Sequence, residues 1–147
     1  MSIMLREKDK KMGELVRLVP FLKSYKGYAY FGECICLAQK NELLLTAIMK
    51  GLYLPVAIKY NTSSSCVERD IRTVCSIVWA NGGKEAVGLW GYLNFERVPA
   101  NKRCIEMILN ILREEKMEML WDLQEIKLVI RNHVKEEPCD AADLISG

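Results

Sequence analysis

The chain has 147 residues, is 50% hydrophobic and carries a formal net charge of only +2, which is the composition of one ordinary globular domain with an appendage. The N-terminus, MSIMLREKDKK, is charged where a secretory signal needs an apolar core, and no window reaches the roughly 18 apolar residues of a membrane span. We therefore expect a cytoplasmic protein with no membrane partner. Its charge is uneven, at about +5 over residues 1 to 60, about +2 over 61 to 104 and about −5 over 105 to 147.

Helical spacing of apolar residues dominates the chain as far as about residue 115. The first predicted helix ends near Pro20, and its apolar stripe is Met12, Leu15, Val16, Val19 and Leu22. Further helices are predicted over 28 to 39, from an N-cap at Asn41 to a break at Gly51, and over LPVAIKYN with Pro55 in the first turn.

The clearest helix is predicted over residues 63 to 80, within YNTSSSCVERDIRTVCSIVWANGG. Ser63 is one candidate N-cap, and Ser65 with Glu68 forms an alternative capping-box pattern. Asn81-Gly82-Gly83 is a strong stop signal. On a helical wheel the apolar stripe is Val67, Ile71, Val74 and Val78, with Cys75 at its edge. The opposite face is Ser65, Arg69, Arg72 and Ser76, flanked by Glu68, Cys66 and Thr73.

Pro99 and Asn101 introduce a last long helix over about 102 to 115, and no strand-like alternation competes before residue 120. The predicted fold is therefore all-α, a compact bundle of about six helices. A short helix, a tight turn and the helix 63 to 80 make a helix-turn-helix, whose second helix enters a DNA major groove. Serine hydroxyls and helix N-terminal amides suit phosphates, and arginine suits guanine.

Three stretches carry a resemblance: KGY at 26 to 28, the run from Ile48 to Thr62, and VERxIRxxxxxxW from Val67 to Trp79. Over about residues 10 to 115 the chain resembles the C-terminal DNA-binding effector domain of the master response regulator that initiates sporulation in endospore-forming bacteria. The resemblance implies a six-helix bundle that binds a short guanine-containing box, often as tandem copies.

The resemblance also implies roles for individual residues. The matching recognition-helix positions are Ser65, Glu68, Arg69, Arg72 and Thr73, with Thr62 and Ser63 at the turn placed for phosphates. Glu68 would accept from a cytosine amino group, Arg69 would read guanine, and Arg72 would lie nearer the backbone. A base-reading arginine of the family pattern is replaced here by Cys66, so we expect an altered target box or weaker binding.

Only about 20 residues precede the similar region, so phosphorylation of a receiver domain in the same chain is not the expected switch. The sequence divides into a DNA-binding domain over 1 to 115 and an extension over 116 to 147. In that extension a helix is predicted from one stripe, and the period-two alternation of EIKLVIRN leaves an extended segment as the alternative. A homodimer through this helix is expected, and residues 136 to 147 are expected to fray. The predicted stripe is Met119, Leu123, Ile126, Ile130 and Val134.

Enzymatic and metal chemistry find little support in the sequence. The six cysteines include no CxxC pair, His133 stands alone, and no glycine loop suits a phosphate. We expect reduced, mostly buried thiols, no cofactor and no catalysis. Two hypotheses remain: a regulator that binds double-stranded DNA, and an interaction module of the same fold that has lost specific DNA reading and antagonises another regulator.

Overall fold

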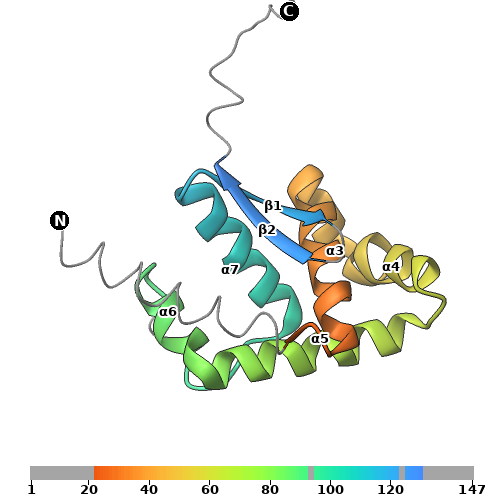
Figure 1. Cartoon of the computed structure of the whole chain (residues 1–147), viewed down its shortest axis with the longest axis horizontal. Coiled ribbons are helices and arrows are strands. Elements are labelled where there is room, and N and C mark those ends of the chain that lie inside the picture. Colours follow the sequence, from red (N-terminus) through yellow and green to blue (C-terminus); the bar gives the residue numbers. More distant parts are fainter. Residues whose placement is uncertain (1–21, 93–94, 123–124, 131–147) are drawn as a thin grey trace, which may run out of the picture.

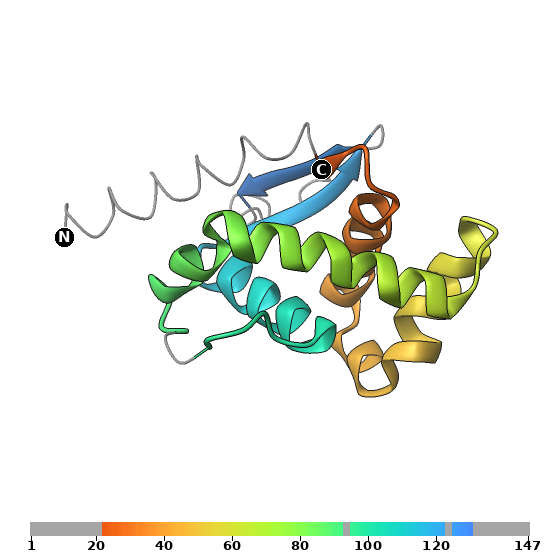
Figure 2. The same ribbon diagram turned by 90° about the horizontal axis from the view of Figure 1, so that it is seen from below.

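The computed structural model describes residues 22 to 92, 95 to 122 and 125 to 130. Helix α3 (Lys26–Lys40) runs through the middle and contacts every layer. Helix α5 (Ser64–Val78) lies along one side of α3 and α7 (Asn101–Glu114), and a two-stranded hairpin lies along the other (Figures 1 and 2). The helical fold class predicted from the sequence is confirmed.

Two short helical turns connect α3 to the helix-turn-helix. Asn41 ends α3 and begins a 3-10 helix, η1 (Glu42–Ala47), because its side chain accepts a hydrogen bond from the Leu43 amide at 3.1 Å. Gly51 was predicted to end a helix, but it lies inside the wide turn η2 (Met49–Tyr53). A Cβ there would come within 2.5 Å of the Leu44 carbonyl oxygen, so glycine is needed for a close approach rather than for a stop.

The remaining helices follow the predicted order. Helix α4 (Leu54–Lys59) carries Pro55 in its first turn, as expected, because a first-turn proline forfeits no internal hydrogen bond. After α5, the chain bends through η3 (Trp79–Gly83), where Gly82 has a φ of 113°, and continues as α6 (Lys84–Gly88). The predicted stop at Asn81-Gly82-Gly83 is therefore a bend between two helices.

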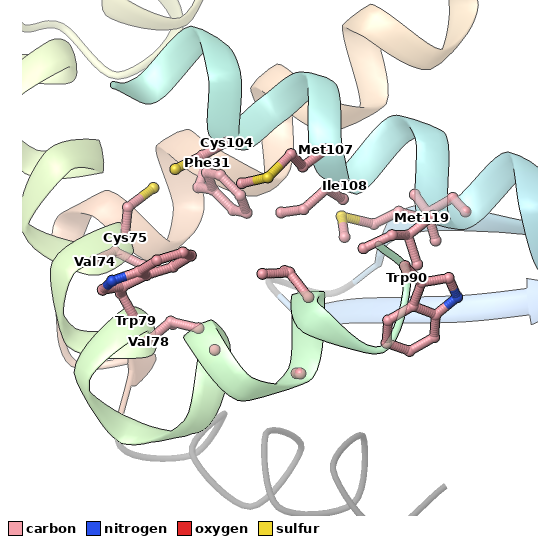
Figure 3. Close-up of a pocket in the computed structure, with 15 residues that line it drawn as sticks. Phe31, Val74, Cys75, Val78, Trp79, Trp90, Cys104, Met107, Ile108 and Met119 are labelled. Carbon is pink, nitrogen blue, oxygen red and sulfur yellow. The ribbon is translucent and has the colours of Figure 1, made fainter. Parts of the chain in front are cut away.

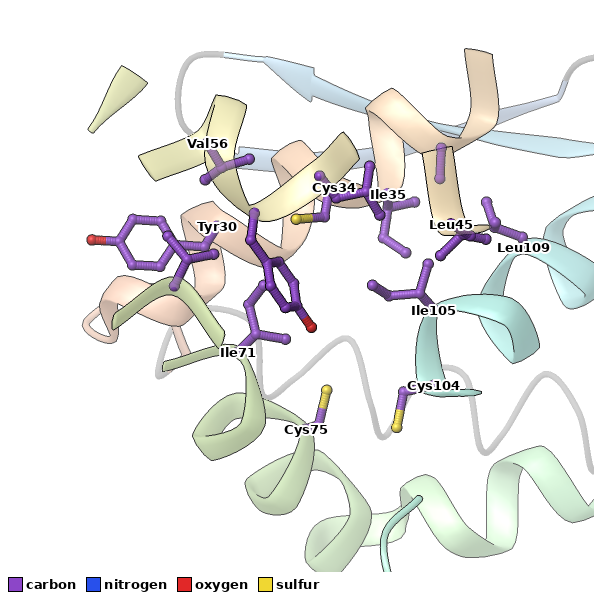
Figure 4. Packing of buried hydrophobic residues seen from close by; sticks show 14 of the residues in the cluster. Tyr30, Cys34, Ile35, Leu45, Val56, Ile71, Cys75, Cys104, Ile105 and Leu109 are labelled. Atoms are coloured by element: carbon purple, nitrogen blue, oxygen red, sulfur yellow. The ribbon is translucent and has the colours of Figure 1, made fainter. Parts of the chain in front are cut away.

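The core forms where α3, η2, α4, α5 and α7 meet. Figure 4 shows side chains from these elements pointing toward one another, with Ile35 and Ile105 close to the middle. The largest fully buried side chains are Ile35, Leu52, Ile71, Ile105, Val56, Val67 and Cys34. Tyr53 joins them at 2% exposure, and burial raises the pKa of its hydroxyl to about 12.

The helix predicted after residue 116 is wrong for the part that the structure describes. Residues Met117–Asp122 form strand β1 and Glu125–Ile130 form β2, paired antiparallel with Met117 opposite Ile130. Lys116 has a φ of 57°, which ends α7 and redirects the chain. Along this register, residues in phase with Met119 are apolar and most of the others are charged, so the period-two alternative was the correct one.

The hairpin is fixed to α3 through Met119. Its side chain is buried at 7% exposure, and its backbone exchanges two hydrogen bonds with the Gln39 side chain, at 2.8 and 2.6 Å. The Cys36 thiol donates to the same carbonyl at 3.4 Å. The predictions for residues 1 to 21 and 131 to 147, including most of the first helix, His133, Cys139 and the frayed tail, lie outside the described residues.

Candidate nucleic-acid interface

The turn between α4 and α5 is short and closed by backbone hydrogen bonds. The Thr62 amide donates to the Ala57 carbonyl at 2.9 Å, and the Asn61 amide donates to the Ile58 carbonyl at 3.3 Å. Asn61 has a φ of 56°, a left-handed conformation that asparagine adopts more readily than most residues. The turn therefore sets α5 at a fixed angle to α4, as a helix-turn-helix requires.

Ser63 caps α5, so the first of the two predicted N-caps is confirmed. Its hydroxyl oxygen accepts a hydrogen bond from the Cys66 amide at 3.1 Å. Ser65 is exposed beside it, and Cys66 is partly exposed. Hydrogen bonds from the Ser63 and Thr62 side chains, together with the positive charge of Arg69, lower the pKa of the Cys66 thiol.

The outer face of α5 carries two arginine side chains that are each more than half exposed, Arg69 at 61% and Arg72 at 55%. Arg72 pairs with Glu68 one turn earlier, so Glu68 does not complete the alternative capping box. Arg69 lies 3.5 Å from the Asp70 carboxylate. Exposed pairs of this kind contribute about 0.2–1 kcal/mol, so either arginine can exchange its partner for DNA at low cost.

Thr73, the last predicted contact residue, is also exposed, and its hydroxyl donates to the Arg69 carbonyl at 3.2 Å. The structure thus brings all eight predicted positions together on the turn and the outer side of α5. They are Thr62, Ser63, Ser65, Cys66, Glu68, Arg69, Arg72 and Thr73.

The opposite face of α5 is packed tightly into the protein. Val67 and Ile71 are fully buried and Val74 is 3% exposed, which confirms the main part of the predicted apolar stripe. A Cβ on Gly27 of α3 would lie 2.0 Å from the Asp70 carbonyl oxygen. Because the two helices approach each other this closely only with glycine at residue 27, α5 is held at a defined depth.

Asn101 is a residue whose role the sequence did not reveal. Asparagine before an apolar helix reads as an N-cap, but Ala100 occupies that position and Asn101 begins α7 with a side chain only 6% exposed. Its amide group donates to the Glu68 carbonyl at 2.9 Å, which ties α7 to the middle of α5. The tie needs two segments that are 33 residues apart, so local spacing could not predict it.

Metal and membrane chemistry add nothing to this interface. Within residues 22 to 92, 95 to 122 and 125 to 130, no three His, Cys, Asp or Glu side chains are grouped to hold a metal ion. Five described cysteines are free thiols, and Cys34, Cys75 and Cys104 are buried. No helix in the described part of the chain is long and apolar enough to cross a membrane.

A short helix, a closed turn and a longer helix with a basic outer face define this chain as a helix-turn-helix DNA-binding domain. Comparison with protein families identifies it further. The family model described as "Sporulation initiation factor Spo0A C terminal" matches residues 13–112. The chain belongs to this family of DNA-binding regulatory domains of sporulation initiation, as its resemblance predicted, and the family is not one of enzymes.

Proposed function

We propose that this protein is a sequence-specific transcription regulator that inserts α5 into the DNA major groove at a promoter box. The observation that carries the proposal is the position of Arg69 and Arg72, both exposed on the face of α5 opposite its buried stripe. The N-terminal part of a recognition helix is the part that reaches base edges. Arg69 lies on the second turn of α5, within reach of that role.

Individual roles follow from position and chemistry. Arg69 reads a guanine through a forked pair of hydrogen bonds, and Arg72 neutralises a backbone phosphate once it leaves Glu68. Glu68, released in turn, accepts from a cytosine amino group. Thr62, Ser63, Ser65 and Thr73 contact the DNA backbone.

Cys66 is the position at which this chain departs from the family pattern. A thiol makes no forked contact with guanine, and each good forked pair contributes about 1–3 kcal/mol of discrimination. The expected consequence is a box that differs from the family's guanine-containing box at the base pair facing Cys66. Selection from a random pool of double-stranded DNA would identify that box without assuming it.

The proposal is tested by titrating the selected box with the intact protein and with Arg69→Ala at several salt concentrations. Loss of a base contact predicts an affinity decrease of about 5- to 150-fold for the box and little change for random DNA. Arg113→Ala is the matched control, because it removes the same charge from an exposed side chain at the far end of α7. No selected sequence and equal binding by Arg69→Ala would refute the proposal.

Arg72→Ala separates a phosphate contact from a base contact. It should weaken binding to all DNA sequences alike and lower the slope of log affinity against log salt by about 1. The result expected for Arg69→Ala differs, since that variant should lose preference among sequences. If the two variants behave identically, the assignment of one to bases and the other to phosphates is wrong.

The alternative is an interaction module that has kept the fold and lost DNA reading. It is favoured by Cys66 and by the carboxylates of Glu68 and Asp70, which already engage the two arginines. Failure to select any DNA, combined with an intact fold, would support it. The proposal that the regulator acts as a homodimer no longer has a C-terminal helix to use, and sedimentation of the protein with and without its selected box would test it.

A further inference from the structure

A cavity of about 230 Å³ lies behind the recognition helix. Its walls are the C-terminal half of α5, the bend into α6, one face of α7, Phe31 of α3 and Met119 of the hairpin. Figure 3 shows Trp79 and Trp90 at opposite ends of this space, with Met107 and Ile108 along the α7 side. The cavity therefore connects the helix-turn-helix to the hairpin.

The lining of the cavity is apolar throughout. None of the described side chains around it carries a formal charge, and the heteroatoms are the sulfurs of two cysteines and two methionines and the two indole nitrogens. The Trp90 indole N–H donates to the Glu115 carboxylate at 2.7 Å. Nothing in this lining matches a charged or strongly polar ligand.

The two cysteines in the wall reinforce this character. Cys75 of α5 and Cys104 of α7 face each other in Figure 4, and both are more than nine-tenths buried. A hydrogen bond to Cys104 and burial raise the pKa of the Cys75 thiol well above its ordinary value. The Cys104 thiol also donates to the Pro99 carbonyl at 3.4 Å. Cys75 thus stays protonated near neutral pH.

Water is a poor occupant of such a space, because an ordered water needs two to four polar partners. A cavity of about 150 Å³ lined by aliphatic and aromatic side chains stays dry and accepts benzene. At about 230 Å³, this one has room for a single aromatic ring with a short alkyl substituent. An occupant of that kind would regain the dispersion contacts that the lining atoms otherwise lack.

We propose that the cavity between α5, α6 and α7 is a binding site for an uncharged, apolar small molecule of about the size of a substituted benzene. The ligand contacts Val74 and Val78 of α5 on one side and Met107 and Ile108 of α7 on the other. Its binding therefore joins the recognition helix to α7. This site is independent of the proposed DNA contacts, which lie on the outer face of α5.

Toluene is a suitable probe, added to the intact protein and followed by NMR. The expected result is a set of intermolecular nuclear Overhauser effects (NOEs) from toluene to the methyl groups of Met107, Ile108 and Met119. Saturable chemical-shift changes of the same methyl groups would give the affinity. Neither measurement depends on DNA or on a variant that folds.

Ala86→Leu fills the cavity from within, because Ala86 is 2% exposed and lies in its wall. Toluene affinity should fall at least tenfold in this variant. Ala47→Leu is the matched control, since the same change at an exposed position of η1 should leave binding unaltered. Circular dichroism of both variants confirms that each is folded.

Two results would overturn the proposal. One is the absence of NOEs between toluene and the three methyl groups in the wild-type protein, or unchanged binding by a folded Ala86→Leu. The other concerns the chain's own N-terminal residues, since Leu22 packs beside Val74 and Val78 of the cavity wall. NOEs from the Met12 or Leu15 methyl groups to Ile108 in the ligand-free protein would assign the space to that segment.

Discussion

The helix-turn-helix and the β1–β2 hairpin lie on opposite sides of α3 and α7, and they are held to the molecule in different ways. Helix α5 presses two fully buried side chains, Val67 and Ile71, into the core and approaches α3 as closely as a glycine allows. In the described part of the hairpin, the ties to α3 converge on one residue, Met119. The DNA-facing side is therefore built into the core, whereas the hairpin is attached to it.

The difference matters for function because a reading helix must keep its position while its outer side chains change partners. On α5 the outer face holds only exposed ion pairs, which are weak, while the inner face holds the buried stripe. The hairpin lies outside the region matched to the family, so it adds a surface without altering the helix that reads DNA. Variants can test each half of this comparison separately.

The largest effect is expected from Gly27→Ala. The added Cβ would meet the Asp70 carbonyl oxygen at 2.0 Å and a Val74 methyl group at 2.8 Å, so α3 and α5 would have to separate. Overpacking typically costs about 1–3 kcal/mol, and contact with rigid backbone places this change at or above the upper end. Urea unfolding measures it.

Gly91→Ala is the control for that variant. Gly91 has a φ of 96° with nothing within 4 Å of an added Cβ, so the cost there is backbone strain of about 1–2 kcal/mol without a clash. If Gly27→Ala proves no more destabilising than Gly91→Ala, the close packing of α3 on α5 does not fix the recognition helix.

A smaller effect is expected from Asn101→Ala. The variant loses the hydrogen bond to the Glu68 carbonyl and should cost about 1–2 kcal/mol of stability. Because Asn101 is buried and touches no DNA in the proposed complex, affinity for the selected box should fall with the salt slope unchanged. Asn110→Ala, an exposed asparagine of the same helix, should stay within about 0.5 kcal/mol of wild type. A changed salt slope in Asn101→Ala would mean that the residue acts on phosphates directly.

On the other side of the molecule, Gln39→Ala should loosen the hairpin alone. Two hydrogen bonds to the Met119 backbone are lost, at about 0.5–1.5 kcal/mol each, with part of that recovered by water because the site is only partly buried. Hydrogen exchange at the Met119 amide should quicken while amides of α5 keep their protection. Lys40→Ala, at the next and exposed position of α3, is the control. Faster exchange in α5 as well would show that the two regions unfold as one unit.

The same comparison explains what could be predicted from the sequence. The helix-turn-helix is encoded by local signals, the Asn41 and Ser63 caps and the apolar stripe of α5, so its start and its exposed face were predicted correctly. The hairpin depends on contacts with Gln39 and Cys36, about 80 residues away, and its short apolar pattern fits periods of both two and 3.6. Asn101 was read as a cap for the same reason, because its partner on α5 is remote in sequence.

The smallest expected effect concerns Cys66, at the position where the family pattern has an arginine. Hydrogen bonds from Ser63 and Thr62 lower the pKa of its thiol, so the thiolate forms at a lower pH than in an ordinary cysteine. Below that pKa the side chain is neutral and DNA affinity is at its full value. As pH rises through it, a negative charge appears on the face that meets the phosphates, and affinity should fall about twofold to fivefold.

Titrations of the selected box between pH 6 and 9 at fixed salt would measure this decrease. Cys66→Ser keeps a small hydrogen-bonding group that stays neutral over this range, so its affinity should not change with pH in this way. Cys36→Ser, a thiol on α3 and away from α5, should retain the decrease seen in the wild type. A pH dependence that persists in Cys66→Ser would place the titrating group elsewhere and leave Cys66 as a neutral neighbour of the DNA. A flat Cys66→Ser profile beside a falling wild-type profile would place residue 66 at the DNA, where the missing arginine of the family pattern also belongs.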